Sequence, residues 1–281
     1  MKKDAAYYES AYNPRGAVPQ FADHFERWRK KSAAARSALG GYRNVAYGPH
    51  PMQRLDFFRA KGRSRALLAY LHGGYWRALD KDDQTFIATP FVERDISVAM
   101  VNYALCPAVH VQDIVLQVAQ ACAWLYRNGP NFGAPSGRLF VSGHSAGGHL
   151  TAMMLAVLWP KFSADLPAKV VQGGLSISGV FDTEPVMRTE SVNVDVRLTP
   201  VEAKRVSPAF MPPATDAPLY LAVGGKEQKG FQEQHDLIRS RWKSVVQDEL
   251  PCPEDDHFTI LDRFADPASA LFKGAIRMMG A

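Results

Sequence analysis

The stretch that most constrains the fold of this chain is the pentapeptide Gly143–Gly147, which has the pattern G-x-S-x-G. The apolar run Leu139–Val141 before it is typical of a short buried strand, and apolar residues from Leu150 to Leu158 recur at helical spacing after it. A strand that passes into a helix within so few residues needs small side chains around the turn and a strained backbone at its centre. The sequence therefore predicts that Ser145 lies on a tight corner, a nucleophile elbow, at the C-terminal edge of a sheet.

Strand and helix patterns alternate along the chain, which predicts a mostly parallel sheet with helices on both faces. Strands are expected at residues 45–47, 54–58, 66–71, 96–101, 139–141, 170–177, 219–223 and 244–250. Helices are expected at residues 20–39, 111–126, 150–158 and 231–242, and from about residue 267 to the C-terminus. Residues 66–71 are apolar throughout, as in a strand that is buried on both faces.

The length of 281 residues and the hydrophobic content of 47% are sufficient for a sizeable core. We expect a single domain over residues 1–281, which begins with a helical segment at residues 1–41. Within that segment, Asn13–Gly16 has the composition of a turn. Residues 182–215 are rich in Pro, Arg and Thr and interrupt the alternation of strands and helices. They are expected to form a small lid-like insertion over the C-terminal ends of the strands.

Composition argues against several classes of protein. The net charge is +5, but the cations are scattered, whereas nucleic-acid-binding proteins usually gather them on one face. The three cysteines are too few and too scattered for a disulfide framework or a zinc site, and they favour a reducing, cytoplasmic location. Residues 139–160 lack charged side chains, but their glycines, serines and histidines fit a buried strand and helix better than a membrane span. We expect no nucleic-acid partner and no membrane contact, with a homodimer as an open option.

A serine hydroxyl becomes a good nucleophile only when a base removes its proton. On a sheet with this corner, the acid and then the histidine follow the serine along the chain. His257 lies in a polar loop after the last expected strand, from which it can reach Ser145, so we expect it to be the base. His149, one turn along the helix from Ser145, and His235, on an apolar helical stripe, are expected to be structural.

The acid is expected directly after the penultimate strand, where Glu227 follows two glycines and a lysine. Asp182 is the second candidate, because it follows the strand at residues 170–177. Asp255 and Asp256 are too close to His257 in the sequence to orient its ring. Glu227 is therefore the first choice for the carboxylate that orients the histidine and stabilises its charged form.

A second loop is expected to face the serine, and it reads His-Gly-Gly-Tyr-Trp at residues 72–76. Gly73 and Gly74 allow the backbone to turn its N–H groups towards a carbonyl oxygen that becomes negative. With the N–H of Ala146 at the start of the following helix, they would form an oxyanion hole. Tyr75 and Trp76 are expected at the mouth of the site, where they could stack on a planar substrate.

The sequence indicates neither a metal nor a cofactor. No histidine pair has the spacing of a metal site with a carboxylate nearby. His72 is instead expected to anchor its own loop by hydrogen bonding. A non-catalytic binding protein on the same scaffold is the alternative class, but such proteins usually lack the nucleophile or the base, and this chain has both.

The loop at residues 72–76 resembles the HGGxW motif of the kynurenine formamidases (arylformamidases), a branch of the α/β-hydrolases close to the hormone-sensitive-lipase esterases. The resemblance covers most of the chain, through Tyr12–Arg15, Leu79–Asp82, Asn102–Pro107, the pentapeptide and Asp256–Phe258. It implies an α/β-hydrolase fold with a small lid and no metal. By this resemblance the catalytic serine falls on Ser145, the histidine on His257 and the acid on Glu227, where the family commonly has Asp.

The resemblance also implies a reaction, the hydrolysis of N-formylkynurenine to formate and kynurenine. The branch includes esterases and amidases of other substrates. The alternatives are therefore a general short-chain carboxylesterase and an amidase that acts on another aromatic substrate. In each case the expected partner is a small aromatic amide or ester.

Overall fold

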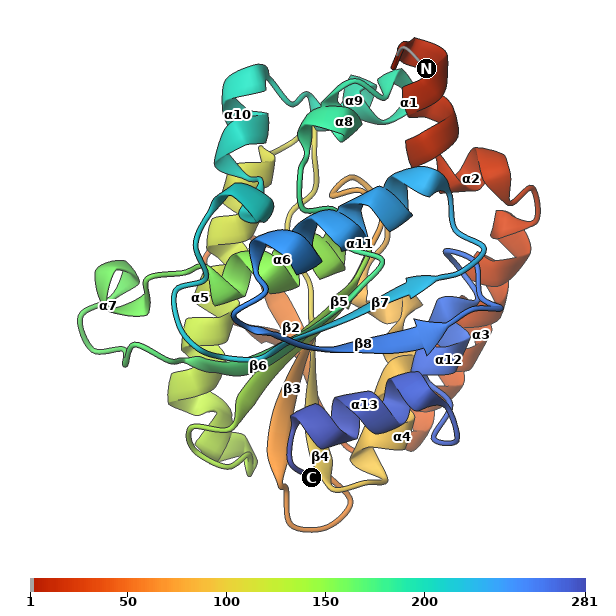
Figure 1. Ribbon diagram of the computed structural model, residues 1–281. Helices are drawn as coiled ribbons and strands as arrows, with labels where there is room; N and C mark the ends of the chain where they lie inside the picture. Colours follow the sequence, from red (N-terminus) through yellow and green to blue (C-terminus); the bar gives the residue numbers. More distant parts are fainter. Residues whose placement is uncertain (1–2) are drawn as a thin grey trace.

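The computed structural model describes residues 3–281, and these residues contain an eight-stranded sheet (Figure 1). The strand order is β1-β2-β4-β3-β5-β6-β7-β8, in which β2 is antiparallel to both of its neighbours and all further pairs are parallel. The prediction of a mostly parallel sheet is thus confirmed. The strands are β1 (Gly41–Ala46), β2 (Arg54–Phe58), β3 (Ala66–Leu71), β4 (Ile96–Val101), β5 (Leu139–His144), β6 (Val171–Ile177), β7 (Leu219–Gly224) and β8 (Val246–Cys252).

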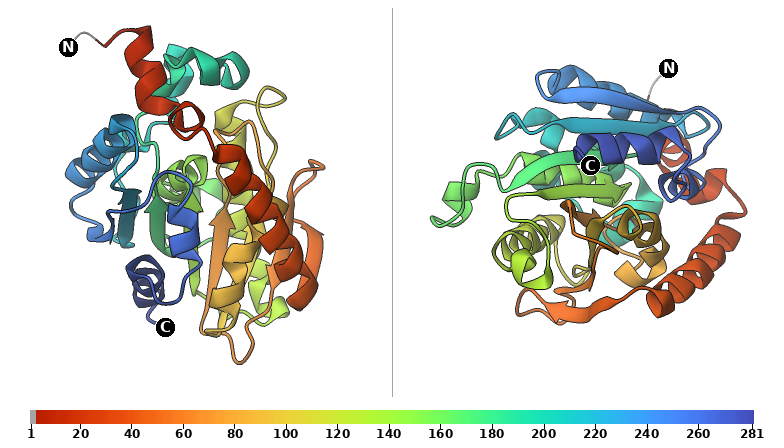
Figure 2. Two further views of the ribbon diagram at one scale, coloured as in Figure 1. Left: turned by 90° about the vertical axis from the view of Figure 1, so that its right-hand side faces the viewer. Right: turned by 90° about the horizontal axis from the view of Figure 1, so that it is seen from below.

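Helices cover both faces of this sheet (Figure 2). One face carries α3 (Phe21–Ala38), α4 (Ala88–Val92), α12 (Ile260–Phe264) and α13 (Ala270–Met278), and the other carries α5 (Val111–Asn128), α6 (Ala146–Leu155) and α11 (Lys229–Arg241). The remaining helices are α1 (Ala5–Tyr12), α2 (Pro14–Ala17), α7 (Trp159–Phe162), α8 (Glu184–Met187), α9 (Glu190–Val196) and α10 (Pro200–Arg205). Single 3-10 turns are η1 (Lys81–Asp83), η2 (Thr85–Ile87), η3 (Gly129–Phe132) and η4 (Pro208–Phe210).

The central strand β3 shows why its sequence is apolar at every position. Successive side chains of a strand point to opposite faces of the sheet. Leu67, Ala69 and Leu71 accordingly belong to the core under α5 and α6, whereas the alternate residues of β3 belong to the core under α3 and α13. Both faces are fully covered, so neither set can be polar.

The expected strands lie close to their observed bounds, whereas short helices that the sequence did not predict occur near the N-terminus and at α4, α7, α8, α9, α10 and α12. The expected turn at Asn13–Gly16 is part of a short helix, α2, that follows a further helix, α1. Side chains begin both helices: Asp4 accepts a hydrogen bond from the backbone N–H of Tyr7, and Asn13 accepts one from Gly16, each at 3.0 Å. Among residues 3–281, no helix is both long and apolar enough to cross a membrane.

The N-terminal helix α1 packs on the segment that interrupts the strand–helix alternation. It lies beside α8, α9 and α11 (Figure 1). The carboxylate of Glu9 accepts hydrogen bonds from the backbone N–H and the hydroxyl of Ser191, at 2.8 and 2.7 Å. Two segments that are far apart in the sequence therefore lie side by side. The lid-like role of residues 182–215 stays a prediction.

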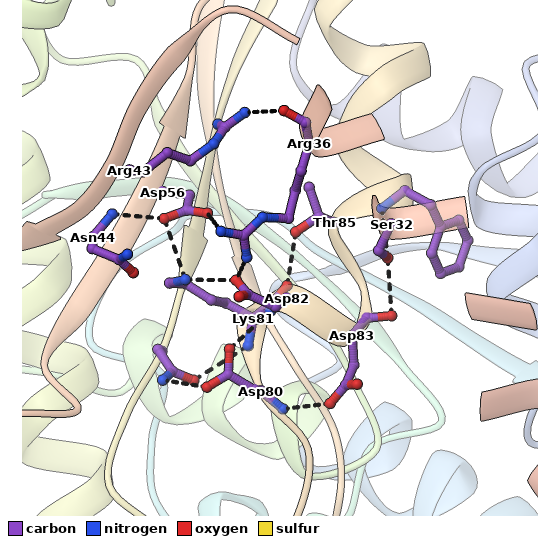
Figure 3. A network of polar contacts seen from close by, with 12 residues as sticks. Ser32, Arg36, Arg43, Asn44, Asp56, Asp80, Lys81, Asp82, Asp83 and Thr85 are labelled. Carbon is purple, nitrogen blue, oxygen red and sulfur yellow. Dashed lines mark hydrogen bonds and ion pairs between the residues drawn. The ribbon is translucent and has the colours of Figure 1, made fainter. Parts of the chain in front are cut away.

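A buried ionic network attaches α3 to the sheet (Figure 3). The ammonium group of Lys81 lies 3.3 Å from Asp56 on β2 and 2.6 Å from Asp82. Arg36 on α3 contacts both aspartates. The backbone N–H of Asn44 donates a 2.8 Å hydrogen bond to Asp56, whose side chain is completely buried. The network fixes α3 and the turn η1 relative to one edge of the sheet.

We expect Lys81→Met to lower the free energy of unfolding by about 3 kcal/mol or more, because it removes the buried cation closest to the carboxylate of Asp56. Urea unfolding followed by circular dichroism measures this change. Lys30→Met is the matched control, since the Lys30–Glu26 pair is exposed and such pairs contribute little. Equal stabilities of the two variants would contradict the assignment.

Candidate active site

Ser145 lies at the corner between β5 and α6, as the pentapeptide predicts. Its backbone has φ 57° and ψ −115°, outside the regions that most residues adopt. The backbone N–H donates a 2.8 Å hydrogen bond to the carbonyl of Ile177 on β6, which secures the corner to the neighbouring strand. The predicted strain at this residue is therefore confirmed.

The glycines on either side of Ser145 allow a close approach of three chain segments. A Cβ atom at residue 143 would lie 2.4 Å from the carbonyl oxygen of Gly147. A Cβ atom at residue 147 would lie 2.0 Å from the carbonyl oxygen of Leu71 on β3. Both contacts involve backbone atoms, which cannot move aside, so both positions require glycine.

His257 and Glu227 form a buried pair. The imidazole Nδ1 lies 2.6 Å from Oε2 of Glu227, and both side chains are almost completely shielded from solvent. The other carboxylate oxygen accepts hydrogen bonds from the hydroxyl of Ser178 at 2.5 Å and from the N–H of Gly224 at 2.7 Å. Because an ionised carboxylate only accepts, Nδ1 of His257 carries the shared proton, and in the neutral ring Nε2 is free to accept another.

This pair forms because the loops after β7 and β8 are hydrogen-bonded to each other. The backbone N–H of Gly225 donates to Cys252 at 2.9 Å, and that of Lys226 donates to Asp255 at 3.0 Å. A Cβ atom at Gly224 would lie 2.2 Å from the carbonyl oxygen of Asp255. Glycine at this position therefore lets the loop that carries Glu227 approach the loop that carries the histidine.

The other candidate carboxylates have different contacts. Asp182 accepts a 3.0 Å hydrogen bond from the backbone N–H of Glu184 at the start of α8. Asp255 pairs with Arg263 at 3.1 Å. Asp256 accepts backbone hydrogen bonds at the start of the turn that follows it. Glu227 alone among the carboxylates considered from the sequence has a recorded contact with the histidine ring.

The loop at residues 72–76 lies against the serine. A Cβ atom at Gly73 would lie 2.9 Å from the carbonyl oxygen of His144 and 3.4 Å from Cβ of Ser145. Gly74 has φ +105°, where a side chain would lie 2.1 Å from the carbonyl oxygen of Ala78. Within residues 3–281, the N–H groups of Gly73, Gly74 and Ala146 donate to no other protein group. These donors therefore remain available beside the hydroxyl.

His72 and His149, which the sequence predicts to be structural residues without a catalytic role, bond to backbone carbonyl groups. Nδ1 of His72 lies 2.8 Å from the carbonyl oxygen of Gly73, and its ring stacks on Tyr103 at 4.2 Å, so the predicted anchoring of this loop is confirmed. His149 is buried, and its Nε2 donates to the carbonyl of Val206 at 2.7 Å. Burial lowers the pKa of His149 to about 4. His149 is thus a neutral core residue.

Tyr75 and Trp76, which the sequence placed together at the mouth, differ in position. Tyr75 lines the cavity beside Ser145, and its hydroxyl donates a 2.6 Å hydrogen bond to the carbonyl of Tyr12. Trp76 is completely buried, packs edge-on against His149 at 4.9 Å, and is not among the residues that line the cavity. The large indole gains more from core packing than from exposure.

The described part of the chain has a cavity that both Ser145 and His257 line. Its walls come from the N-terminal segment, the loop after β3, the elbow, α9 and the loop after β8. The lining residues are Asn13, Pro14, Arg15, Phe25, Trp28, Gly74, Tyr75, Arg77, Leu79, Gln84, His144, Ser145, Val192, His257 and Phe258. No group of three metal-ligating side chains occurs in the range 3–281.

Residues 68–227, more than half of the chain, match the family described as the alpha/beta hydrolase fold. The chain belongs to the alpha/beta hydrolase fold family. The match contains the loop at residues 72–76, the elbow and Glu227, and it ends before the loop of His257.

A curated relative and a solved structure match this α/β hydrolase along its whole length, beyond the residues 68–227 that match the family. A kynurenine formamidase of Danio rerio is 28% identical over 100% of this chain and 97% of its own length. A kynurenine formamidase of Drosophila melanogaster is 32% identical over 61% of this chain and 57% of its own length. The crystal structure of a candidate thioesterase from Silicibacter sp. tm1040 is 29% identical, with a TM-score of 0.83 and complete coverage of both chains.

Sequence reasoning on this α/β hydrolase missed several residues of the cavity wall. His144, inside the pentapeptide, has its ring centroid 4.6 Å from that of His257. Burial and, second, the charge of His257 hold the pKa of His144 well below its ordinary value, so it stays neutral. Trp28 and Phe25 lie on the predicted amphipathic helix, but the pattern shows which face is buried and not what it faces.

We expect Gly147→Ala to lower the free energy of unfolding of this hydrolase by about 3 kcal/mol or more, because its methyl group would overlap a carbonyl of β3. Gly40→Ala is the control, since a Cβ atom at residue 40 has no neighbour within 4 Å. Urea unfolding of both variants measures the difference. Equal free energies of unfolding for Gly147→Ala and Gly40→Ala would contradict the close contact between Gly147 and the carbonyl of Leu71.

Proposed function

We propose that this α/β hydrolase is a serine hydrolase that cleaves an amide or ester of a small acyl group, with an aryl formamide such as N-formylkynurenine as its preferred substrate. The observation that carries the proposal is the buried contact between Glu227 and His257, because His257 lines the same cavity as Ser145. A strained serine, a histidine with a fixed tautomer and free N–H donors together support acyl transfer.

In the proposed reaction, Ser145 attacks the carbonyl carbon while Nε2 of His257 takes the hydroxyl proton. The carbonyl oxygen becomes negative, and His257 then gives the proton to the leaving amine or alcohol as the acyl bond breaks. Water, deprotonated by the same Nε2, attacks the acyl-enzyme, and His257 then returns this proton to the oxygen of Ser145 as the acyl–serine bond breaks and the acid leaves. Glu227 holds the ring in place and stabilises its charged form in each half of the reaction.

The N–H groups of Gly73, Gly74 and Ala146 are the proposed oxyanion hole. They have no protein partner within the described residues, and Gly73 is close enough to the serine that a Cβ atom added to it would lie 3.4 Å from Cβ of Ser145. Ala146 is the first residue of α6, whose N-terminus adds a partial positive charge. Donors that are already oriented stabilise the developing charge without reorganisation during the reaction.

Two observations favour an aryl formamide. The relative from Danio rerio that bears the name kynurenine formamidase aligns with this chain along its whole length. The cavity wall is also rich in aromatic side chains, contributed by Phe25, Trp28, Tyr75 and Phe258. Such a wall suits an aromatic leaving group, and a formyl group needs little room at the serine.

A short-chain carboxylesterase is the second candidate. The solved structure that matches the whole chain bears the name of a thioesterase, an enzyme that, like a carboxylesterase, cleaves an acyl bond other than an amide. Esters and amides pass through the same tetrahedral intermediate, so the serine, the histidine and the oxyanion donors would act alike on both. Substrate comparison separates the two functions, as described below.

We further propose a cytoplasmic location. Cys106, Cys122 and Cys252 are all unpaired and buried. Burial raises the pKa of Cys106 to about 11 and that of Cys122 to about 12, so these thiols stay protonated and unreactive. Unpaired thiols are usual in a reducing compartment.

Ser145→Ala is expected to lower kcat about 10⁴-fold or more and to abolish labelling by a fluorophosphonate, because the nucleophile is lost. Hydrolysis of p-nitrophenyl acetate and of an aryl formamide measures the first effect, and mass spectrometry of the labelled protein measures the second. Labelling that persists in the variant would exclude Ser145 as the nucleophile, and an unlabelled parent protein would favour a binding protein.

Glu227→Gln is expected to lower kcat about 10²- to 10⁴-fold, since an amide cannot stabilise the charged imidazole as a carboxylate does. Asp182→Asn is the matched control and is expected to retain kcat close to that of the parent. Steady-state kinetics on p-nitrophenyl acetate tests both variants. A large loss in Asp182→Asn with a small loss in Glu227→Gln would reverse the assignment of the acid.

For the choice of substrate, we expect kcat/KM to be at least about 10-fold higher for N-formylkynurenine than for p-nitrophenyl acetate, because the aromatic wall contacts the leaving group of the former more fully. Parallel kinetic measurements on the two compounds decide the matter. A ratio that strongly favours the ester would reject the formamidase and leave the carboxylesterase.

A further inference from the structure

The cavity beside Ser145 carries an excess of positive charge. Within the described residues its lining includes two arginines, Arg15 and Arg77, and neither an aspartate nor a glutamate. Glu227 is behind the ring of His257 and is not part of the wall. Cations that line a low-dielectric cleft attract anionic groups.

Arg77 already has an anionic partner. Its Nη1 lies 2.6 Å from the carboxylate of Asp195, and it donates a 2.7 Å hydrogen bond to the carbonyl of Ser191. Through these contacts the guanidinium of Arg77 attaches the loop after β3 to α9. Arg77 therefore has a structural role, and its positive charge is already paired with Asp195.

Arg15 has no such partner. No hydrogen bond or ion pair joins its guanidinium to any residue in the range 3–281. It lies instead over the rings of Phe21 and Phe25, at 5.5 Å from each centroid. Partial desolvation and, second, the positive charge of Arg77 lower the pKa of Arg15, as expected for a cation beside another cation and away from any acid.

The backbone that carries Arg15 is held by hydrogen bonds just before and just after this residue. The side chain of Asn13 accepts a 3.0 Å hydrogen bond from the N–H of Gly16 across the turn. The hydroxyl of Tyr75 donates to the carbonyl of Tyr12 at 2.6 Å. A guanidinium on a fixed backbone, seated on two aromatic rings, loses little freedom when it binds a ligand.

We propose that Arg15 is a specificity-determining residue that binds a carboxylate of the substrate while Ser145 attacks its acyl group. The substrate class is then an aromatic amide or ester whose leaving group carries a carboxylate. A guanidinium forms two parallel hydrogen bonds with a carboxylate, which gives both affinity and orientation. The inference rests on the proposed function, because it assigns a further part of the same substrate.

A binding experiment on the full-length Ser145→Ala protein tests this without any catalytic step. The probes are 4-oxo-4-phenylbutanoate, an aryl ketone with a carboxylate, and its neutral amide, and isothermal titration calorimetry measures both affinities. We expect the carboxylate to bind about 10- to 100-fold more tightly than the amide. High salt should reduce this preference, because the charged partners are near the solvent.

Arg15→Gln, added to Ser145→Ala, should remove the preference, and Arg15→Lys should restore part of it, since an ammonium group lacks the paired geometry. Arg241→Gln is the matched control: Arg241 is exposed and lies 5.5 Å over Phe210, but does not line the cavity. It should keep the full preference. The affinity for the amide serves as the internal reference for an intact cavity.

Three results would overturn the assignment: equal affinities for the two probes, no binding of the carboxylate, or a preference that survives Arg15→Gln. Failure of the proposed function gives a different result. If the parent protein hydrolysed neither aryl formamides nor esters, the proposed function would fall, whereas the preference for the carboxylate would still be measured in the binding experiment.

Discussion

The contact between α6 and β3 is the constraint on which the site depends. Gly147 passes so close to the carbonyl of Leu71 that any side chain at this position would overlap it. The helix can therefore begin directly above the centre of the sheet, with its first N–H groups aimed at the space in front of the strands. Ser145 takes its unusual backbone angles as a consequence, since no relaxed conformation joins β5 to a helix in that place.

A similar close backbone contact, between the loops after β7 and β8, brings Glu227 and His257 together. The loops after β7 and β8 are joined by backbone hydrogen bonds and by glycines at residues 224 and 225, whose missing side chains leave room for the partner loop. This arrangement removes Glu227 from solvent and points it at His257. The positions of Ser145, Glu227 and His257 thus depend on close backbone contacts between neighbouring parallel strands and the loops that follow them.

The alternation of apolar runs and helical stripes was sufficient to predict the sheet, because each strand is buried on two faces and each main helix on one. The elbow, the loop at residues 72–76 and the candidate residues Ser145, Glu227 and His257 could be predicted, because each directly follows an expected strand in the sequence. The residues that form the cavity wall could not be predicted from the sequence. Trp76 and Tyr75 are neighbours of similar type, yet one is in the core and the other faces the cavity. Short helices such as α1 and α2, begun by single side chains, also leave no periodic signal.

One part of the cavity wall comes from a segment of the chain that is far in sequence from the proposed catalytic residues. Phe25 and Trp28 belong to α3, which the ionic network around Asp56 and Lys81 holds against one edge of the sheet, and Asn13 lies between α1 and α2. The proposed catalytic residues Ser145, Glu227 and His257 instead follow the C-terminal ends of β5, β7 and β8. Substitutions at Asn13, Phe25 or Trp28 would therefore reshape the cavity without replacing any of the proposed catalytic residues.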